Sequence, residues 1–163
     1  MTNKWIHVVS AAAVVWAVTA LSVVTSRAQN AAPAAPAQAA APMAASGVWS
    51  GVYSETQAKR GEGTANKACG SCHGVDLMGG EAGPALVGLE FLGNWNQQSV
   101  GDLFDRIHAT MPADAPGSLS LSDTADIVAR VLQLNKMPAG QKDLSSDVTA
   151  LSQIKIESQP PAK

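Results

Sequence analysis

Two cysteines and a histidine lie together in the sequence and form its clearest chemical motif. Two residues separate Cys69 from Cys72, and His73 follows directly. These are the only two cysteines of the 163-residue chain. Three kinds of chemistry use this arrangement: a structural metal site, a dithiol redox pair and a covalently attached haem.

The first two kinds of site fit the rest of the sequence poorly. A structural zinc ion needs four ligands, usually from two such pairs, whereas this chain has one pair and only His7 and His108 as further histidines. A thioredoxin-like dithiol would follow a strand in a βαβ unit, and the sequence shows no such unit. A disulfide between Cys69 and Cys72 would close a very short loop and add little stability.

The haem interpretation uses every residue of the motif. On a helix, the side chains of Cys69 and Cys72 lie on one face. Both can then form thioethers to the vinyl groups of one porphyrin, while His73 points its imidazole at the iron. We therefore predict one covalent haem c, with its iron, bound through Cys69, Cys72 and His73.

A methionine is the expected ligand on the other face of the haem, because a His/Met pair raises the reduction potential of the iron. The methionines beyond the N-terminal segment are Met43, Met78, Met111 and Met137. The first lies in a linker, the second is too close to His73 in sequence, and the last follows a helix, where packing is the simpler role. Met111 lies 38 residues after His73, and Pro112 stiffens the loop that presents its sulfur. Ordinary core packing of Met111 and ligation by His108 are the alternatives.

Short helices are the elements that must position these residues. Ser54 and Gln57 have capping-box spacing, which predicts a helix from about residue 55 into the cysteine motif. Apolar residues at helical spacing predict a second helix at about 98–109 and a third that ends near Leu134.

Long loops connect the predicted helices. Residues 74–88 contain five glycines and a proline, and residues 111–120 contain two prolines and a glycine. No convincing strand pattern is present. We predict an all-α domain whose loops wrap around a bulky cofactor, since loops this long are uncommon in a small domain.

Composition excludes one class of partner and supports a buried cofactor. The formal net charge is −2 and no basic run is present, which argues against nucleic-acid binding. Aromatic residues make up 4% of the chain, and two of the four tryptophans lie in the first twenty residues. A large cofactor would complete a core that has so few rings.

The N-terminal 28 residues have the layout of a secretory signal peptide, with Lys4 before an almost uncharged run and small residues before a cleavage site at Ala28. An uncleaved anchor, which would tether the chain to a membrane through residues 5–26, is the alternative. We expect an alanine- and proline-rich linker at 29–46, a folded domain at 47–158 and a disordered tail at 159–163.

The segments "ACGSCHG", "GPALVG" and "MPADAPGSLS" resemble those of class I cytochromes c. In particular, residues 48–156 resemble the small monohaem cytochromes that accept electrons for periplasmic quinoprotein alcohol and sugar dehydrogenases. The resemblance implies a class I cytochrome c fold, a location in the periplasm and an electron carrier rather than an enzyme. Its partners would be a quinoprotein dehydrogenase as donor and an oxidase or another cytochrome as acceptor.

The resemblance also implies roles for three residues around the haem. The backbone carbonyl of Pro84 would accept the Nδ1 proton of His73 and orient its ring. Leu86 would pack against the haem, and Trp95 would face a propionate. The chain departs from the family pattern at Ala65 and Arg130, where the family has aromatic residues, and we expect Arg130 to turn outward.

Two other functions remain as alternatives. One is a haem enzyme or sensor, peroxidase-like or gas-binding, with a labile sixth ligand. The other is a fixed relay subunit of a dehydrogenase or oxidase complex. In the carrier, Lys59, Arg60 and Lys67 would steer an acidic partner or simply form a solvated helix face.

Overall fold

The computed structural model describes residues 46–162. These residues belong to one compact unit of the chain. The predicted signal peptide, and the predicted linker except for its last residue, lie outside the described residues. Both therefore stay predictions.

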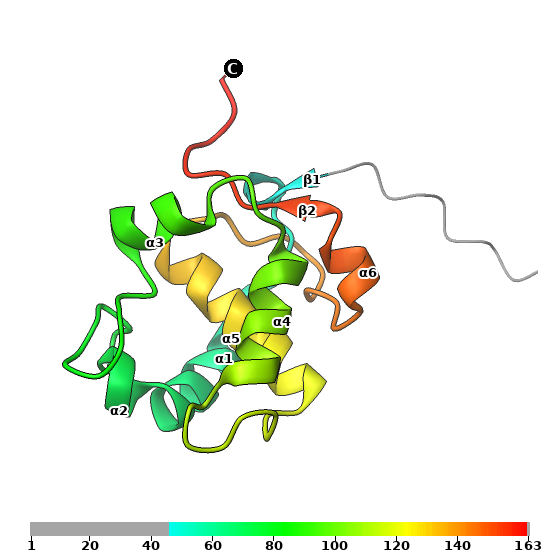
Figure 1. The fold of residues 1–163 in the computed structure, drawn as a ribbon. Coiled ribbons are helices and arrows are strands. Elements are labelled where there is room, and N and C mark those ends of the chain that lie inside the picture. Colours follow the sequence, from blue (N-terminus) through cyan, green and yellow to red (C-terminus); the bar gives the residue numbers. More distant parts are fainter. Residues whose placement is uncertain (1–45, 163) are drawn as a thin grey trace, which may run out of the picture. The chain divides into compact units, whose positions relative to one another are not determined.

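The described residues form a mostly helical domain, which confirms the predicted all-α class (Figure 1). A single turn of 3-10 helix, Val48–Ser50, precedes the first α-helix. In chain order, the helices are α1 (Glu55–Ala68), α2 (Gly70–His73), α3 (Gly88–Trp95), α4 (Val100–Thr110), α5 (Leu121–Leu134) and α6 (Val148–Leu151). Two very short strands, β1 (Ser46–Gly47) and β2 (Ile154–Lys155), pair in parallel.

The three predicted helices correspond to α1, α4 and α5, and side-chain caps begin each of them. The hydroxyl oxygen of Ser54 accepts a hydrogen bond from the backbone N–H of Gln57, and Ser120 caps α5 in the same way. The side chain and backbone of Ser99 form a complete capping box with Asp102 at the start of α4. Helices α3 and α6 and the strand pair were not predicted, because each is short and lies among loop residues.

Helices α1 and α5 cross in close contact, and this crossing is the main packing interaction of the domain (Figure 1). Gly61 permits it, since a Cβ at this position would overlap the backbone carbonyl of Asp126. Beside the crossing, Arg130 turns outward less than predicted: its side chain is 20% exposed, because its guanidinium lies 3.1 Å from the carboxylate of Glu62 on α1.

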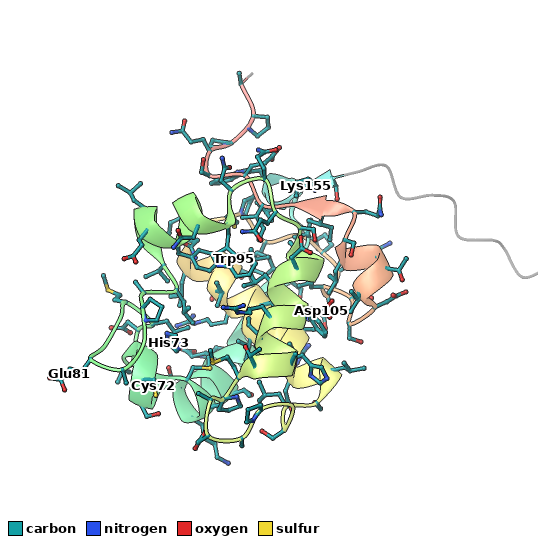
Figure 2. All side chains as sticks on the ribbon, viewed as in Figure 1. Cys72, His73, Glu81, Trp95, Asp105 and Lys155 are labelled. Carbon is teal, nitrogen blue, oxygen red and sulfur yellow. The ribbon has the colours of Figure 1, made fainter. Side chains whose placement is uncertain are left out.

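The haem motif and the paired termini lie on different sides of the domain. Figure 2 shows Cys72 and His73 near the end of α1, and Lys155 of β2 on the far side. Near β2, the indole Nε1 of Trp49 donates a hydrogen bond to the carbonyl of Glu157 at 3.0 Å. The N- and C-terminal ends of the described chain are thus fixed together, away from the cysteines.

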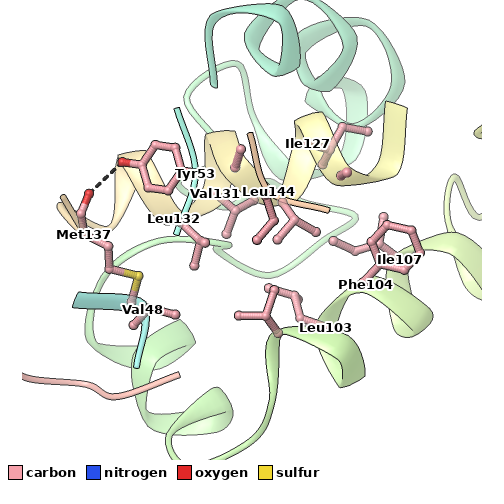
Figure 3. Close-up of a cluster of buried hydrophobic side chains, with 14 of the residues drawn as sticks. Val48, Tyr53, Leu103, Phe104, Ile107, Ile127, Val131, Leu132, Met137 and Leu144 are labelled. Carbon is pink, nitrogen blue, oxygen red and sulfur yellow. Dashed lines mark hydrogen bonds between the residues drawn. The ribbon is translucent and has the colours of Figure 1, made fainter. Parts of the chain in front are cut away.

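The apolar core fills the space between α4, α5 and the segment that follows α5 (Figure 3). Met137 is buried there, and its backbone carbonyl accepts a 2.6 Å hydrogen bond from the hydroxyl of Tyr53. Leu132 and Phe104 are fully enclosed in the same cluster. Within residues 46–162, no helix has the length and apolar character needed to cross a membrane.

Candidate haem-binding site

Both cysteines lie where α1 passes into α2. Cys69 ends α1 and begins α2, and the backbone N–H of His73 donates to its carbonyl at 2.9 Å. This continuous helical path places the three residues of the motif within one turn of each other. The two sulfurs are not joined in a disulfide. Burial, with a smaller contribution from the nearby Cys72, raises the pKa of the Cys69 thiol.

A cavity of about 1060 Å³ opens beside this motif. Its volume lies just above the range, roughly 300–1,000 Å³, that is usual for cofactor and ligand sites. Helices α2, α3, α4 and α5 all contribute to its walls. The site residues predicted from the sequence all line this one cavity: Cys69, Cys72, His73, Pro84, Leu86, Trp95 and Met111.

A hydrogen bond fixes the imidazole of His73. The ring is almost fully buried, and its Nδ1 lies 2.6 Å from the backbone carbonyl oxygen of Pro84. A carbonyl oxygen only accepts, so Nδ1 carries the proton and donates. The other ring nitrogen, Nε2, is then unprotonated in the neutral ring and available as a metal ligand.

The loop between α2 and α3 folds back onto the motif because glycines allow close approach. A Cβ on Gly83 would lie 2.9 Å from Cε1 and Nδ1 of His73, and a Cβ on Gly80 would overlap the carbonyl of Cys72. The backbone N–H of Leu86 donates to the carbonyl of Leu77 at 2.8 Å and closes the loop. The glycines that predicted a loop are therefore also needed for contact with the histidine.

Asn135, directly after α5, holds the other end of this loop. Its amide nitrogen donates to the carbonyls of Leu86 and Val131 at 3.0 and 2.9 Å, and its amide oxygen accepts from the N–H of Gly88 at 3.0 Å. In the sequence Asn135 indicated only the end of a helix. Its burial next to a glycine-rich loop is a tertiary effect that spacing does not reveal.

Met111 lies at the C-terminal end of α4, where its backbone N–H donates to Ile107 at 2.9 Å. Its side chain is half-buried and lines the cavity. Met78 is 72% exposed and does not line the cavity, and Met137 lies in the core. Met43 is outside the described residues. His108 is also absent from the cavity wall and packs against the ring of Phe104, with the ring centroids 6.1 Å apart.

The cavity also has a polar wall that the sequence did not reveal. Beside Trp95 it is lined by Asn94, Gln98, Asp102 and Arg106, from the end of α3 to the second turn of α4. The hydroxyl and the backbone N–H of Ser99 lower the pKa of Asp102, so this carboxyl group stays ionised at neutral pH. All four polar residues look like surface helix residues in the sequence.

These donors suit a haem better than a bare metal ion. Two thiols can anchor the porphyrin, and an imidazole nitrogen with a thioether sulfur is a known axial pair for haem iron. Among residues 46–162 there is no cluster of three or more histidine, cysteine or acidic side chains that could hold a metal ion directly. Most of the cavity wall is apolar, and a group of polar residues, Asn94, Gln98, Asp102 and Arg106, lies together beside Trp95, as suits a planar apolar ring with two carboxylates.

The chain is similar to a cytochrome family and to a solved dehydrogenase structure. Residues 56–131 match a family model described as cytochrome c oxidase, cbb3-type, subunit III. No curated protein matches the chain. Among solved structures, the sulfane dehydrogenase SoxCD from Paracoccus pantotrophus matches with 22% sequence identity and a TM-score of 0.44. That match covers 60% of this chain and 52% of the other, so the chain spans about half of that relative's length.

Proposed function

Because the folded domain is a class I c-type cytochrome, we propose that this protein carries single electrons between redox proteins. One haem c would be attached through the sulfurs of Cys69 and Cys72. His73 and Met111 would be the axial ligands. When bound, the haem iron supplies a one-electron couple.

The observation that carries this proposal is that all four residues line one cavity. His73 comes from α2 and Met111 from the end of α4. The Nδ1 proton of His73 is already donated to the carbonyl of Pro84, which leaves Nε2 as its ligand atom. An iron bound by both side chains has no free coordination position. The site then favours electron transfer over reaction with a substrate at the metal, which is the basis for preferring a carrier to an enzyme or sensor.

The protein's own residues would keep the site fixed while the electron moves. Pro84 orients His73 through its carbonyl, and Asn135 holds Leu86 against the cavity. Both hydrogen bonds are accepted by backbone carbonyls of the loop between α2 and α3, and the hydrogen bond from Leu86 to Leu77 closes that loop. Such fixed ligands reduce the structural change that accompanies electron transfer.

A fixed relay subunit is the second candidate. It is favoured by the family match, because the family model describes a subunit of an oxidase. In either case we propose export to the periplasm, on the basis of the signal-peptide layout of residues 1–28. The donor would be a quinoprotein dehydrogenase and the acceptor an oxidase or another cytochrome, on the basis of the sequence resemblance.

The cations of α1 differ in how free they are to meet a partner. Lys59 pairs with Glu62, while Arg60 pairs with Asp126 and Asp143. Lys67 forms no ion pair within the described part of the chain. Of the three, Lys67 at the end of α1 is therefore the best candidate for steering an acidic partner.

The proposal is tested by purifying the protein from the exported fraction of cells that make it. A pyridine haemochrome spectrum should show haem with both vinyl groups converted to thioethers, in one equivalent per chain. The reduced native protein should not bind carbon monoxide. Rapid carbon monoxide binding would favour the enzyme or sensor, and gel filtration of the native fraction separates a free carrier from a relay subunit.

A further inference from the structure

Three of the four large hydrophobic side chains that are exposed in residues 46–162 lie in one short stretch of the chain. They are Val75, Met78 and Leu89, with exposed fractions of 73%, 72% and 90%. The fourth, Leu121, begins α5. The first two belong to the loop between α2 and α3, and Leu89 belongs to the first turn of α3. Single exposed apolar side chains are normal on a protein surface, but a group of them indicates an interaction site.

The same stretch carries acidic residues and no cation. Between Lys67 and Arg106 the sequence contains five acidic residues and no lysine or arginine. Three of the five, Asp76, Glu81 and Glu90, lie within residues 74–90, which we call the acidic segment. All three are exposed, and none forms an ion pair within the described part of the chain. Their formal charge is therefore not compensated by cations of this domain.

The acidic segment folds back on itself, so that its residues form one continuous surface. The backbone N–H of Leu86 donates to the carbonyl of Leu77 at 2.8 Å. Farther along the loop, the N–H of Gly80 donates to the carbonyl of Gly83 at 3.0 Å. These two hydrogen bonds leave Glu81 at the tip of the loop. They also hold the start of α3 beside the beginning of the loop, which brings the exposed apolar side chains of both together.

The acidic segment covers the side of the domain that contains the predicted haem anchors. The N–H of Gly79 donates to the carbonyl of His73 at 2.9 Å, so the loop lies directly against the cysteine motif. Figure 2 shows Glu81 at the outer edge of the domain beyond Cys72, and Lys155 of β2 on the far side. The described chain begins at β1, which pairs with β2, so the acidic segment is free of that end of the chain.

We propose that the acidic segment is the docking surface for a redox partner that presents apolar side chains surrounded by lysines and arginines. The inference rests on the proposed electron-carrier function. The three exposed apolar side chains would lose their contact with water against the centre of the partner's surface. The three acidic side chains would meet its cations, which steers the encounter. Such a contact is small and short-lived, as redox encounters usually are.

Charge complementarity selects this partner over other occupants of the surface. A second copy of the chain would bring two acidic segments together, and like charges across an interface are unfavourable. An anionic lipid surface would be repelled in the same way. Lys67 at the end of α1 would attract an acidic partner, but it is one cation, whereas the acidic segment carries three acidic residues. A cationic protein is therefore the partner that fits.

The first test is an NMR titration of the isotope-labelled oxidised holoprotein with a helical peptide made of leucine and lysine. The matched control peptide has glutamate in place of each lysine. We expect the lysine peptide to shift the amide signals of residues 74–90 and the glutamate peptide to leave them unchanged. Leu89→Ser should weaken binding of the lysine peptide about three- to tenfold. Leu121→Ser, which removes the other exposed leucine of the described residues, should bind it like the wild type.

The second test measures electron transfer from the reduced holoprotein to two small oxidants by stopped-flow spectroscopy. Tris(phenanthroline)cobalt(III) is cationic and apolar, and hexacyanoferrate(III) is anionic. Each takes one electron from the haem iron(II) and becomes the cobalt(II) or iron(II) complex. At low ionic strength, Glu81→Gln should slow the reaction with the cobalt complex about two- to fivefold and speed the reaction with hexacyanoferrate.

Asp105→Asn is the control for Glu81→Gln. It removes the same charge from an exposed residue, which Figure 2 shows on a different side of the domain from Cys72 and His73. Its rate constants should stay close to those of the wild type. Salt at about 0.5 M should remove the difference between Glu81→Gln and the wild type, because exposed charges are then screened.

Three results would overturn the proposal. The first is a Glu81→Gln variant with the same rate constants as Asp105→Asn. The second is binding of the glutamate peptide in place of the lysine peptide, which would assign the surface to an acidic partner. The third is dimerisation of the wild type that Leu89→Ser abolishes, which would assign it to a second copy of the chain. A wild-type protein without covalent haem in the haemochrome assay would instead disprove the proposed function itself, so the two failures are distinguishable.

Discussion

The ring Nδ1 of His73 lies 2.6 Å from the carbonyl oxygen of Pro84, eleven positions later in the chain. This distance depends on Gly83, whose missing side chain leaves room for the imidazole. The hydrogen bond gives the ring partial imidazolate character and makes Nε2 a stronger donor. One glycine in the loop therefore controls the electronic properties of the proposed proximal ligand.

We predict that Gly83→Ala will raise the reduction potential of the holoprotein. The added methyl group would lie 2.9 Å from the ring of His73, so the ring or the loop must shift and the hydrogen bond weakens. A weaker imidazole donor stabilises the oxidised iron less, and we expect an increase of roughly 20–60 mV, which is about two- to tenfold in the redox equilibrium constant. Potentiometric titration measures this change.

Gly93→Ala is the control for Gly83→Ala, because nothing lies within 4 Å of a Cβ at Gly93 in α3. Equal potentials for both variants would contradict the prediction.

A second prediction concerns Met111. Its replacement by alanine should leave the thioether attachment intact and remove the sulfur ligand. The potential should then fall by on the order of 100 mV or more, since axial ligands set haem potentials over a wide range. Absorption spectra should show loss of the sulfur-to-iron charge-transfer band and rapid binding of carbon monoxide.

Met78→Ala is the control for Met111→Ala, because Met78 is 72% exposed and outside the cavity wall. An unchanged spectrum of Met111→Ala would disprove the ligand assignment.

Replacement by alanine should change the free energy of unfolding in opposite directions at two glycines of α1 that are only two residues apart. A Cβ on Gly61 would overlap the carbonyl of Asp126 in α5, so Gly61→Ala must separate the two helices. We expect a loss of about 1–3 kcal/mol in the free energy of unfolding. No atom lies within 4 Å of a Cβ at Gly63. Gly63→Ala should therefore gain about 0.5–1 kcal/mol from helix propensity. Denaturant titration of the holoproteins by circular dichroism checks both, and a destabilised Gly63→Ala would refute the crossing argument.

The helices could be predicted where a cap and an apolar stripe occurred together. Ser54 and Ser120 are caps in the structure, and the apolar residues that end at Leu134 do face the core. Helix α3 was missed because it follows directly on the glycine-rich loop. Only Phe91 and Trp95, four residues apart, indicated it. The strand pair could not be predicted, since its two-residue strands are joined by contacts between the two ends of the domain.

The residues of the candidate site also differ in whether the sequence could identify them. The spacing of Cys69, Cys72 and His73 identifies their chemistry, because covalent attachment requires these residue types at this separation. The polar wall and Asn135 have no such spacing. Arg106 is exposed and reaches the cavity wall only because Leu103 and Ile107, beside it on α4, face inward. Asn135 is buried only because the loop before α3 folds over it. Tertiary packing, which local sequence does not encode, selects these residues.

Replacement of Asn135 by alanine should destabilise the loop that forms the cavity wall. The substitution removes three hydrogen bonds and leaves the carbonyl of Leu86 and the N–H of Gly88 without their partner. We expect a loss of about 2–4 kcal/mol in the free energy of unfolding, together with faster amide exchange at Gly88. Asn96→Ala is the control, since Asn96 is exposed and accepts one hydrogen bond, from the N–H of Ser158. Similar losses in the two variants would contradict the proposed role.

The last prediction concerns the dependence of stability on pH. The hydroxyl of Ser54, followed by the guanidinium of Arg60, lowers the pKa of Asp143 below its ordinary value of 3.8. The folded state therefore binds this proton less readily than the unfolded state. Asp143 contributes stability above the unfolded-state pKa and loses that contribution as pH falls through the folded-state pKa.

Comparison with Asp143→Asn makes this contribution measurable. The wild type should be more stable than the variant at pH 6–7, and the difference should disappear as the pH is lowered from about 5 to below 3.8. Because Arg60 and Asp143 are both about half exposed, 1 M salt should also reduce the difference at neutral pH. Asp105→Asn is the control, since Asp105 is exposed and its side chain forms no hydrogen bond or ion pair with the described residues. Denaturant midpoints at each pH provide the measurement. A difference that stays constant down to pH 3 would show that Asp143 stabilises the fold without its charge.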